Sequence, residues 1–161
     1  MQLAPADLHL ARHARLREGL RAASLDALIV TSLPNIAYLT GLFASTAALL
    51  VSEFEVCLFV DNRYLAPAEA RQAALGLRLT VVTSGGNFED TISDAARSFS
   101  GGRIGLEGSH MTVRQHRYLE SRLSAESGAP SLIETGAWSK TSSPWRSSTA
   151  RTPGSRSGPS T

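Results

Sequence analysis

His9 and His13 are the first residues in this chain whose type and spacing could do chemistry. They stand four residues apart in a predicted helix, and this spacing suits two metal ligands on one helical face. The residues between them are Leu-Ala-Arg, so the glutamate of a zinc-protease helix is missing, and no third ligand is evident. We therefore expect surface or half-buried helix histidines and no metal ion.

The other reactive side chains have structural interpretations that are simpler than catalysis. His116 lies on the apolar face of a predicted helix, so we expect a packed core histidine. Cys57 lies within the apolar segment EVCLFV, where a thiol is buried and inert. The glycine pairs that begin at Gly85 and Gly101 lack the lysine of a phosphate loop and the spaced glycines of a dinucleotide fold. Spacing alone therefore predicts neither a catalytic residue nor a metal site.

Two polar stretches are candidates for a binding site because each follows an apolar segment that is predicted to form a strand. The first is TSLPNIAYLTG at 31–41, and the second is DNRY at 61–64. An open α/β sheet usually places its ligand-facing loops directly after its strands. In the structural alternative, Asp61 caps a helix and pairs with Arg63, while Tyr38 and Tyr64 pack at the sheet edge. The sequence leaves both interpretations open.

These stretches depend on a framework of alternating elements. Apolar spacing and capping residues predict helices over 7–23, from Pro34 to Gly41, over 64–75, from Asn87 to Gly101, and from Thr112 through Leu123. Strands are predicted over 27–31, 46–52, 55–60, 77–83 and 103–107, with the second and third joined as a hairpin. This alternation predicts an α/β fold in which a mixed β-sheet carries helices on its faces.

Composition divides the 161 residues into a domain at 1–134 and a tail at 135–161. The tail contains no Val, Ile, Leu, Met or Phe, so we expect it to be disordered. Four of the 16 basic side chains lie in the tail, which leaves 12 against 14 acidic ones in the domain, a net charge of −2. We therefore expect no nucleic-acid partner. The longest apolar run is far too short for a membrane helix, and the single cysteine favours a cytoplasmic location.

Four ordered segments resemble the N-terminal domain of the creatinase/prolidase family, which includes Xaa-Pro aminopeptidases, Xaa-Pro dipeptidases and creatinase. The resemblance covers roughly residues 10–132, and its segments are SLDALIVT at 24–31, LPNIAYLTGL at 33–42, DNRY at 61–64 and RIGLE at 103–107. Two positions depart from the family pattern: Ala37 stands where many members carry arginine, and Pro67 stands where a glutamine is common.

The resemblance implies that the family's chemistry belongs to a separate C-terminal domain. There, two aspartates, one histidine and two glutamates hold two divalent metal ions, such as manganese, which activate a water for hydrolysis. None of that domain is present in this sequence, so we expect this chain by itself to be no enzyme and to bind no cofactor.

In such enzymes the N-terminal domain helps to form the dimer and partly covers the active site of a neighbouring subunit. Carried over to this sequence, the candidates for that lining are Asn35, Tyr38, Asp61, Arg63 and Tyr64. An arginine there could hold a substrate carboxylate through two hydrogen bonds.

Two hypotheses follow for the function of the chain. The first is a non-catalytic N-terminal domain of an Xaa-Pro peptidase-like metallohydrolase, with a role in dimerisation and active-site gating and with a second copy or the catalytic domain as its partner. The alternative is a stand-alone binding module that pairs with a separately encoded catalytic chain or holds a small ligand. Because family members continue with a helical linker, we also expect that the reading frame is shifted near Glu134 and Thr135.

Overall fold

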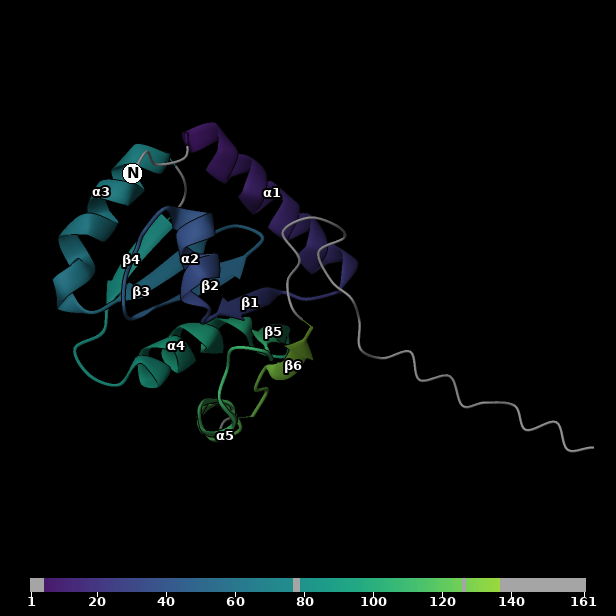
Figure 1. Ribbon diagram of the computed structural model, residues 1–161. Helices are drawn as coiled ribbons and strands as arrows, with labels where there is room; N and C mark the ends of the chain where they lie inside the picture. Colours follow the sequence, from purple (N-terminus) through teal and green to yellow (C-terminus); the bar gives the residue numbers. More distant parts are fainter. Residues whose placement is uncertain (1–4, 77–78, 126, 137–161) are drawn as a thin grey trace, which may run out of the picture.

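A six-stranded sheet forms the middle layer of the protein, and helices cover both of its faces (Figure 1). The computed structural model describes residues 5–76, 79–125 and 127–136. The helices are α1 (Ala6–Ala22), α2 (Leu33–Thr40), α3 (Leu65–Leu75), α4 (Phe88–Ala96) and α5 (Val113–Leu123), with 3-10 turns η1 (Asn62–Tyr64) and η2 (Arg97–Phe99). The strands are β1 (Ala27–Val30), β2 (Ala47–Ser52), β3 (Val56–Val60), β4 (Leu79–Thr83), β5 (Arg103–Glu107) and β6 (Ser131–Thr135).

The strand order is β4-β3-β2-β1-β5-β6, and only β2 runs antiparallel to its neighbours. All four residues of β1 are buried, as expected for a central strand that is covered on both faces. The predicted hairpin is β2 and β3, joined between Ser52 and Glu55. The predicted α/β fold with a mixed sheet is confirmed.

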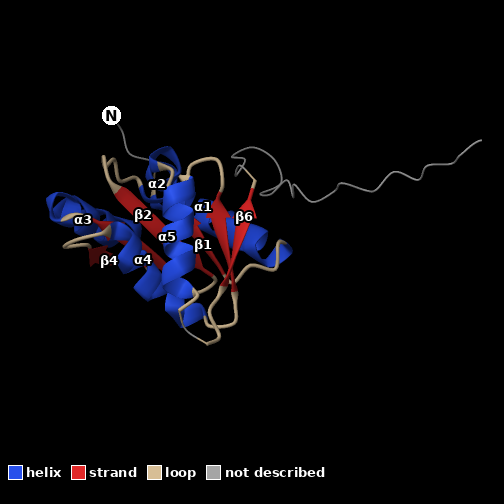
Figure 2. Ribbon diagram, turned by 90° about the horizontal axis from the view of Figure 1, so that it is seen from below, coloured by secondary structure: helices blue, strands red, loops and turns tan. Residues whose placement is uncertain are grey.

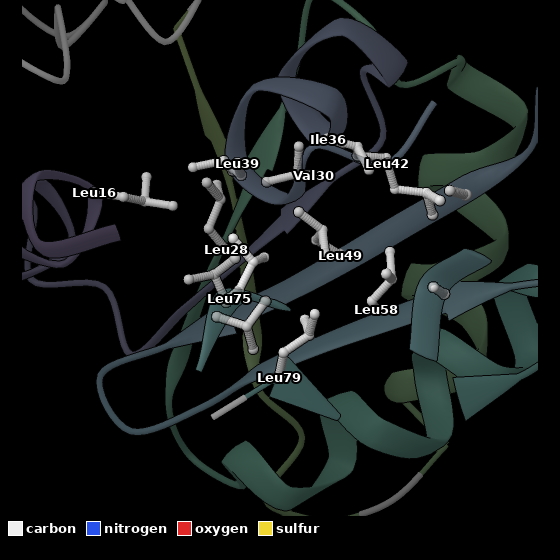
Figure 3. Packing of buried hydrophobic residues seen from close by; sticks show 14 of the residues in the cluster. Leu16, Leu28, Val30, Ile36, Leu39, Leu42, Leu49, Leu58, Leu75 and Leu79 are labelled. Atoms are coloured by element: carbon white, nitrogen blue, oxygen red, sulfur yellow. The ribbon is translucent and has the colours of Figure 1, made fainter. Parts of the chain in front are cut away.

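The two faces of the sheet bury two separate apolar clusters. Leu28 and Val30 point from β1 toward α1, α2 and α3, whereas Ala27 and Ile29 point toward α4 and α5. Figure 3 shows the first cluster, where Leu16 of α1, Leu39 of α2 and Leu75 of α3 gather over the sheet. Figure 2 shows α4 and α5 on the opposite face. Both clusters follow from the alternating direction of successive side chains in a strand.

Local capping signals set the helix boundaries as predicted. The Asn87 side chain accepts a hydrogen bond from the Glu89 amide at the start of α4, and Thr112 and Gln115 form a reciprocal capping box on α5. Gly41 ends α2 with φ of +69°, a left-handed conformation that favours glycine.

Strand β6 is the element that the sequence analysis did not predict. It pairs in parallel with β5, and the Thr135 hydroxyl donates to the carbonyl of Leu106 over 2.7 Å. Thr135, which the sequence analysis placed in the tail, is therefore the last residue of a strand and is buried. The predicted disorder and the reading-frame hypothesis concern a tail that, beyond Gly136, lies outside the described residues.

Candidate functional site

Both polar stretches lie at the carboxyl edge of the parallel strands, where an open α/β sheet usually binds its ligands. The segment 31–41 follows β1 and forms α2, whereas 61–64 follows β3 and forms η1. Strand β5 ends at the same edge with Glu107, because β1 and β5 are parallel neighbours. The fold therefore brings segments that are distant in sequence to one edge, as predicted.

Glu107 is a buried carboxylate that fixes the start of α2. Only 3% of this residue is exposed, and one of its oxygens accepts hydrogen bonds from the backbone amides of Thr31 and Ser32, both at 2.9 Å. Its other oxygen accepts a hydrogen bond from Asn35 Nδ2 at 2.6 Å. The side chain of Asn35 is thus engaged inside the protein, in a link between β5 and α2. Sequence reasoning did not single out Glu107, whose only signal was its place at the end of the RIGLE segment.

The other end of α2 is held by side chains from α1 and α3. The Leu39 carbonyl accepts hydrogen bonds from His9 Nδ1 at 3.0 Å and from His13 Nε2 at 2.8 Å. Arg12 donates to the carbonyl of Tyr38 at 2.6 Å, and Arg71 donates to that of Thr40 at 3.1 Å. These donors satisfy carbonyls that the last turn of a helix leaves without an intrahelical partner.

The expectation that His9 and His13 are surface or half-buried residues is wrong. Each is only 1% exposed, because their face of α1 packs onto the end of α2. Burial lowers the pKa of both histidines below 6.5, nearby guanidinium groups lower it further, and the bond to Leu39 acts in the opposite direction. His9 Nε2 and His13 Nδ1 are buried and have no hydrogen-bond partner. The pair is therefore a neutral structural clamp between α1 and α2.

Asp61 and Arg63 form the cap and ion pair of the structural alternative. Asp61 caps η1 by accepting the Arg63 backbone amide at 2.9 Å, and its carboxylate also accepts Arg63 Nε at 3.2 Å and Nη2 at 2.7 Å. These bonds hold the pKa of Asp61 below its usual range. The Arg63 side chain is nevertheless 71% exposed, so its guanidinium is oriented by Asp61 and open to solvent.

The two tyrosines have different surroundings. The Tyr64 hydroxyl accepts a hydrogen bond from the Ser45 amide at 3.1 Å and lies 3.0 Å from the Ser45 hydroxyl, which ties η1 to the loop before β2. These bonds lower the pKa of Tyr64. The Cζ atom of Arg12 lies 3.8 Å from the centre of the Tyr38 ring, which is a cation–π contact between α1 and α2.

The structure therefore places the five candidates in two separate settings, and of the five only Arg63 is exposed. Asp61, Arg63 and Tyr64 lie within four residues of one another and form one turn with a solvent-facing arginine. Asn35 is buried against Glu107, and Tyr38 is half-buried under Arg12.

A crevice of about 460 Å³ lies at the same edge, on the face that carries α4 and α5. Its lining includes Thr31, Ala48, Glu89, Gln115 and Leu119, and it contains none of the five candidates. Sequence reasoning missed this crevice because its walls come from distant elements and because Gln115 and its neighbours signal only helix caps.

No metal centre or reactive thiol emerges elsewhere in the described residues. No group of three or more His, Cys, Asp or Glu side chains within 5–76, 79–125 and 127–136 could hold a metal ion. Cys57 is half-buried, not fully buried, and burial with the nearby Glu55 carboxylate raises its pKa to about 11. His116 is likewise half-buried on α5. No helix in this part of the chain is both long and apolar enough to cross a membrane.

Comparisons with known proteins agree with this architecture. The sequence model of the Creatinase/Prolidase N-terminal domain matches residues 12–136. The uncharacterized peptidase YqhT of Bacillus subtilis is 26% identical over 98 residues, which are 61% of this chain and 27% of that relative. The chain thus matches about a quarter of the length of this curated relative.

Two solved structures illustrate the similarity of the fold. The N-terminal domain of the cytoplasmic peptidase PepQ from Mycobacterium tuberculosis is 26% identical with a TM-score of 0.66, over 78% of this chain and 93% of that one. The Xaa-Pro dipeptidase from Bacillus anthracis is 19% identical with a TM-score of 0.68, over 80% of this chain and 34% of that one. The second likeness is one of fold alone.

Proposed function

This chain belongs to the creatinase/prolidase N-terminal domain family, and we propose that it is the non-catalytic N-terminal domain of an Xaa-Pro peptidase-like metallohydrolase. In that role it helps to form a dimer and covers part of the active site of a neighbouring subunit. We place it in the cytoplasm, in keeping with its single cysteine and with a relative that is described as a cytoplasmic peptidase.

The residues of this domain do not fit the two metal ions of the family's catalytic site. A two-metal hydrolytic site needs several carboxylate and histidine ligands around one point. The described residues offer no such group, and the histidine pair of α1 is committed to the carbonyl of Leu39. We therefore derive no catalytic step for this chain.

The observation that carries the proposal is the exposed and oriented guanidinium of Arg63. Asp61 engages Nε and Nη2, while Nη1 has no hydrogen-bond partner among the described residues. The hydrogen bonds between Tyr64 and Ser45 hold the turn at the carboxyl edge of the sheet. An arginine fixed in this way can bind a carboxylate with little further loss of side-chain entropy. We propose that Arg63 binds the free carboxylate of an Xaa-Pro substrate in the adjacent subunit.

Asn35 and Tyr38 take a supporting part in this proposal. Both lie on α2, whose two ends are fixed by Glu107 and by the histidine pair. The side chains of Asn35 and Tyr38 face partners within the domain, Glu107 and Arg12. We therefore propose that they hold α2 in place and that Arg63 is the residue that contacts the substrate.

A hybrid enzyme tests this function. Residues 1–136 replace the N-terminal third of the Bacillus anthracis Xaa-Pro dipeptidase, and hydrolysis is measured with an Xaa-Pro dipeptide and with its C-terminal amide. In the Arg63→Ala hybrid we expect KM for the dipeptide to rise about tenfold, because a charge-assisted bond of about 1.5 kcal/mol or more is lost. The amide, which has no carboxylate, should show little change.

Arg21→Ala is the matched control for this substitution. Arg21 is similarly exposed, at 64%, and also pairs with one carboxylate, that of Glu53. An equal effect of the two substitutions on the dipeptide, or an equal effect of Arg63→Ala on dipeptide and amide, would contradict the proposed contact. The mass of the hybrid in sedimentation equilibrium tests the dimer separately, and a monomer with full activity would refute gating across subunits.

A further inference from the structure

The crevice on the α4 and α5 face contains none of the residues 61–64, and it adjoins that turn through Ser45, whose amide donates to the Tyr64 hydroxyl. Its volume of about 460 Å³ lies within the usual range for small-molecule sites. It opens at the carboxyl edge of the sheet, where Thr31 follows β1 and Gly86 follows β4. The lining comes from residues of this chain, so ligand binding can be measured without a catalytic domain.

The inner wall of the crevice is apolar and is part of the packed core. Ala48, Ile92 and Leu119 belong to the second core cluster and are 3%, 4% and 1% exposed. Phe88 and Met111 are half-buried against the same cluster and also line the crevice. A methionine thioether adapts readily to a flat ring. This wall fits an apolar body, such as an aromatic ring system.

The hydrogen-bonding groups at the crevice are fixed in position. The Gln115 side-chain oxygen accepts the amide and hydroxyl of Thr112 in the capping box, so its amide group is held at the start of α5. Thr31 is held by the bond from its backbone amide to Glu107, while its hydroxyl oxygen is buried with no hydrogen-bond partner. That oxygen is closed off from solvent, so the amide group of Gln115 is the fixed group that a ligand in the crevice can reach.

The charge at the crevice is negative. Glu89 is the one ionisable side chain that lines it, and the lining contains no Lys, Arg or His. Arg114 lies in an adjoining hollow of about 440 Å³ that shares Glu89 and Gln115 with the crevice. Within the crevice itself, Glu89 supplies the one formal charge of the lining, and this favours a cationic group over an anionic one.

We propose that this crevice binds a small organic amine, with its apolar body against Ile92 and Leu119 and its ammonium group at Glu89. A second polar atom of the ligand accepts a hydrogen bond from the amide group of Gln115. The proposal does not depend on the peptidase-like role of the domain.

Three indole compounds that differ only in their polar group test the proposal on the whole chain. Tryptamine carries an ammonium group, tryptophol a hydroxyl and indole-3-acetate a carboxylate. Affinities come from isothermal titration, and the site comes from amide chemical-shift changes in two-dimensional NMR. We expect tryptamine to bind about threefold more tightly than tryptophol and to shift the amides of Thr31, Ala48, Gly86 and Gln115. Indole-3-acetate should bind most weakly.

The Glu89→Gln variant should remove the preference for tryptamine over tryptophol and leave the binding of tryptophol unchanged. Glu69→Gln is the matched control, because Glu69 is an exposed helix residue on α3, on the other face of the sheet. The proposal is overturned if tryptamine causes no shift at the crevice, if the three compounds bind equally, or if Glu89→Gln behaves like Glu69→Gln.

Discussion

The histidine pair between α1 and α2 should make the stability of the domain depend on pH just below neutrality. His9 and His13 are buried, and each donates one ring N–H to the carbonyl of Leu39. Protonation would place a hydrogen on His9 Nε2 and on His13 Nδ1, which are buried and have no acceptor. The charged and titratable groups that face the pair are the cations Arg12, Arg17 and Arg71, so no neighbouring carboxylate offsets the new charges.

The sign of the effect follows from the direction of the two pKa shifts. In the folded protein the pKa of each histidine is lowered by burial, whereas in the unfolded chain it lies near 6.5. Between these values the unfolded chain binds protons that the folded protein does not, so the free energy of unfolding falls as the pH falls. The stabilisation is complete above about pH 6.5 and is lost as the pH drops through the lowered values.

Proton linkage sets an upper limit on the change in the free energy of unfolding per pH unit. Each histidine contributes at most about 1.4 kcal/mol per pH unit, so the pair contributes at most about 2.7 kcal/mol per pH unit. Most small domains are stable by about 5–15 kcal/mol, so one unit of acidification is a large perturbation.

Urea unfolding between pH 8 and pH 5, followed by far-ultraviolet circular dichroism, measures this slope. The double variant His9→Gln/His13→Gln keeps hydrogen-bond donors but cannot titrate, so its free energy of unfolding should change much less below pH 6.5. His110→Gln is the control, because His110 is exposed at the end of the turn that precedes α5. A double variant that loses stability as steeply as the parent would refute the neutral clamp.

Three further predictions concern single residues. Glu107→Gln should lower the free energy of unfolding by about 3 kcal/mol, because glutamine has one acceptor oxygen and its NH2 group would face either Asn35 or the amides of Thr31 and Ser32. Unchanged urea unfolding would contradict this. Gly41→Ala should cost about 1–2 kcal/mol in the same assay, because its φ is +69° and a Cβ would lie 2.5 Å from Arg71 Nη2. Gly85→Ala, where a Cβ meets nothing within 4 Å, should cost less than about 0.5 kcal/mol, so equal losses at the two glycines would refute the reasoning. Cys57, with its pKa raised to about 11, should react with iodoacetamide at pH 8 about 100-fold more slowly than a free thiol, and a similar rate would show that the thiol is not shielded.

The elements that sequence reasoning located are those with strong local signals. Helix caps involve residues that are close in the sequence, so their pattern is sufficient to place a helix end. The examples here are the capping box of Thr112 and Gln115, the cap at Asn87 and the left-handed Gly41. The cap and ion pair of Asp61 and Arg63 were one of two interpretations left open by the sequence, and they were recognisable because the partners are two residues apart.

The features that sequence reasoning missed depend on contacts between distant segments. Strand β6 contains only two large apolar residues, Leu132 and Ile133, and it exists because β5 offers a parallel edge. The burial of His9 comes from a carbonyl 30 residues away, and the link from Asn35 to Glu107 spans 72 residues. The spacing of residues within one segment of the sequence does not predict contacts between such distant segments. The crevice has the same origin, because its walls come from several separate elements.

Hydrolysis of an Xaa-Pro dipeptide by the purified chain, supplied with manganese, tests the central claim most directly. We predict no cleavage by the chain alone and metal-dependent cleavage by the hybrid that carries a catalytic domain. Metal-dependent cleavage by the chain alone, abolished by a chelator, would contradict the assignment of a non-catalytic gating domain.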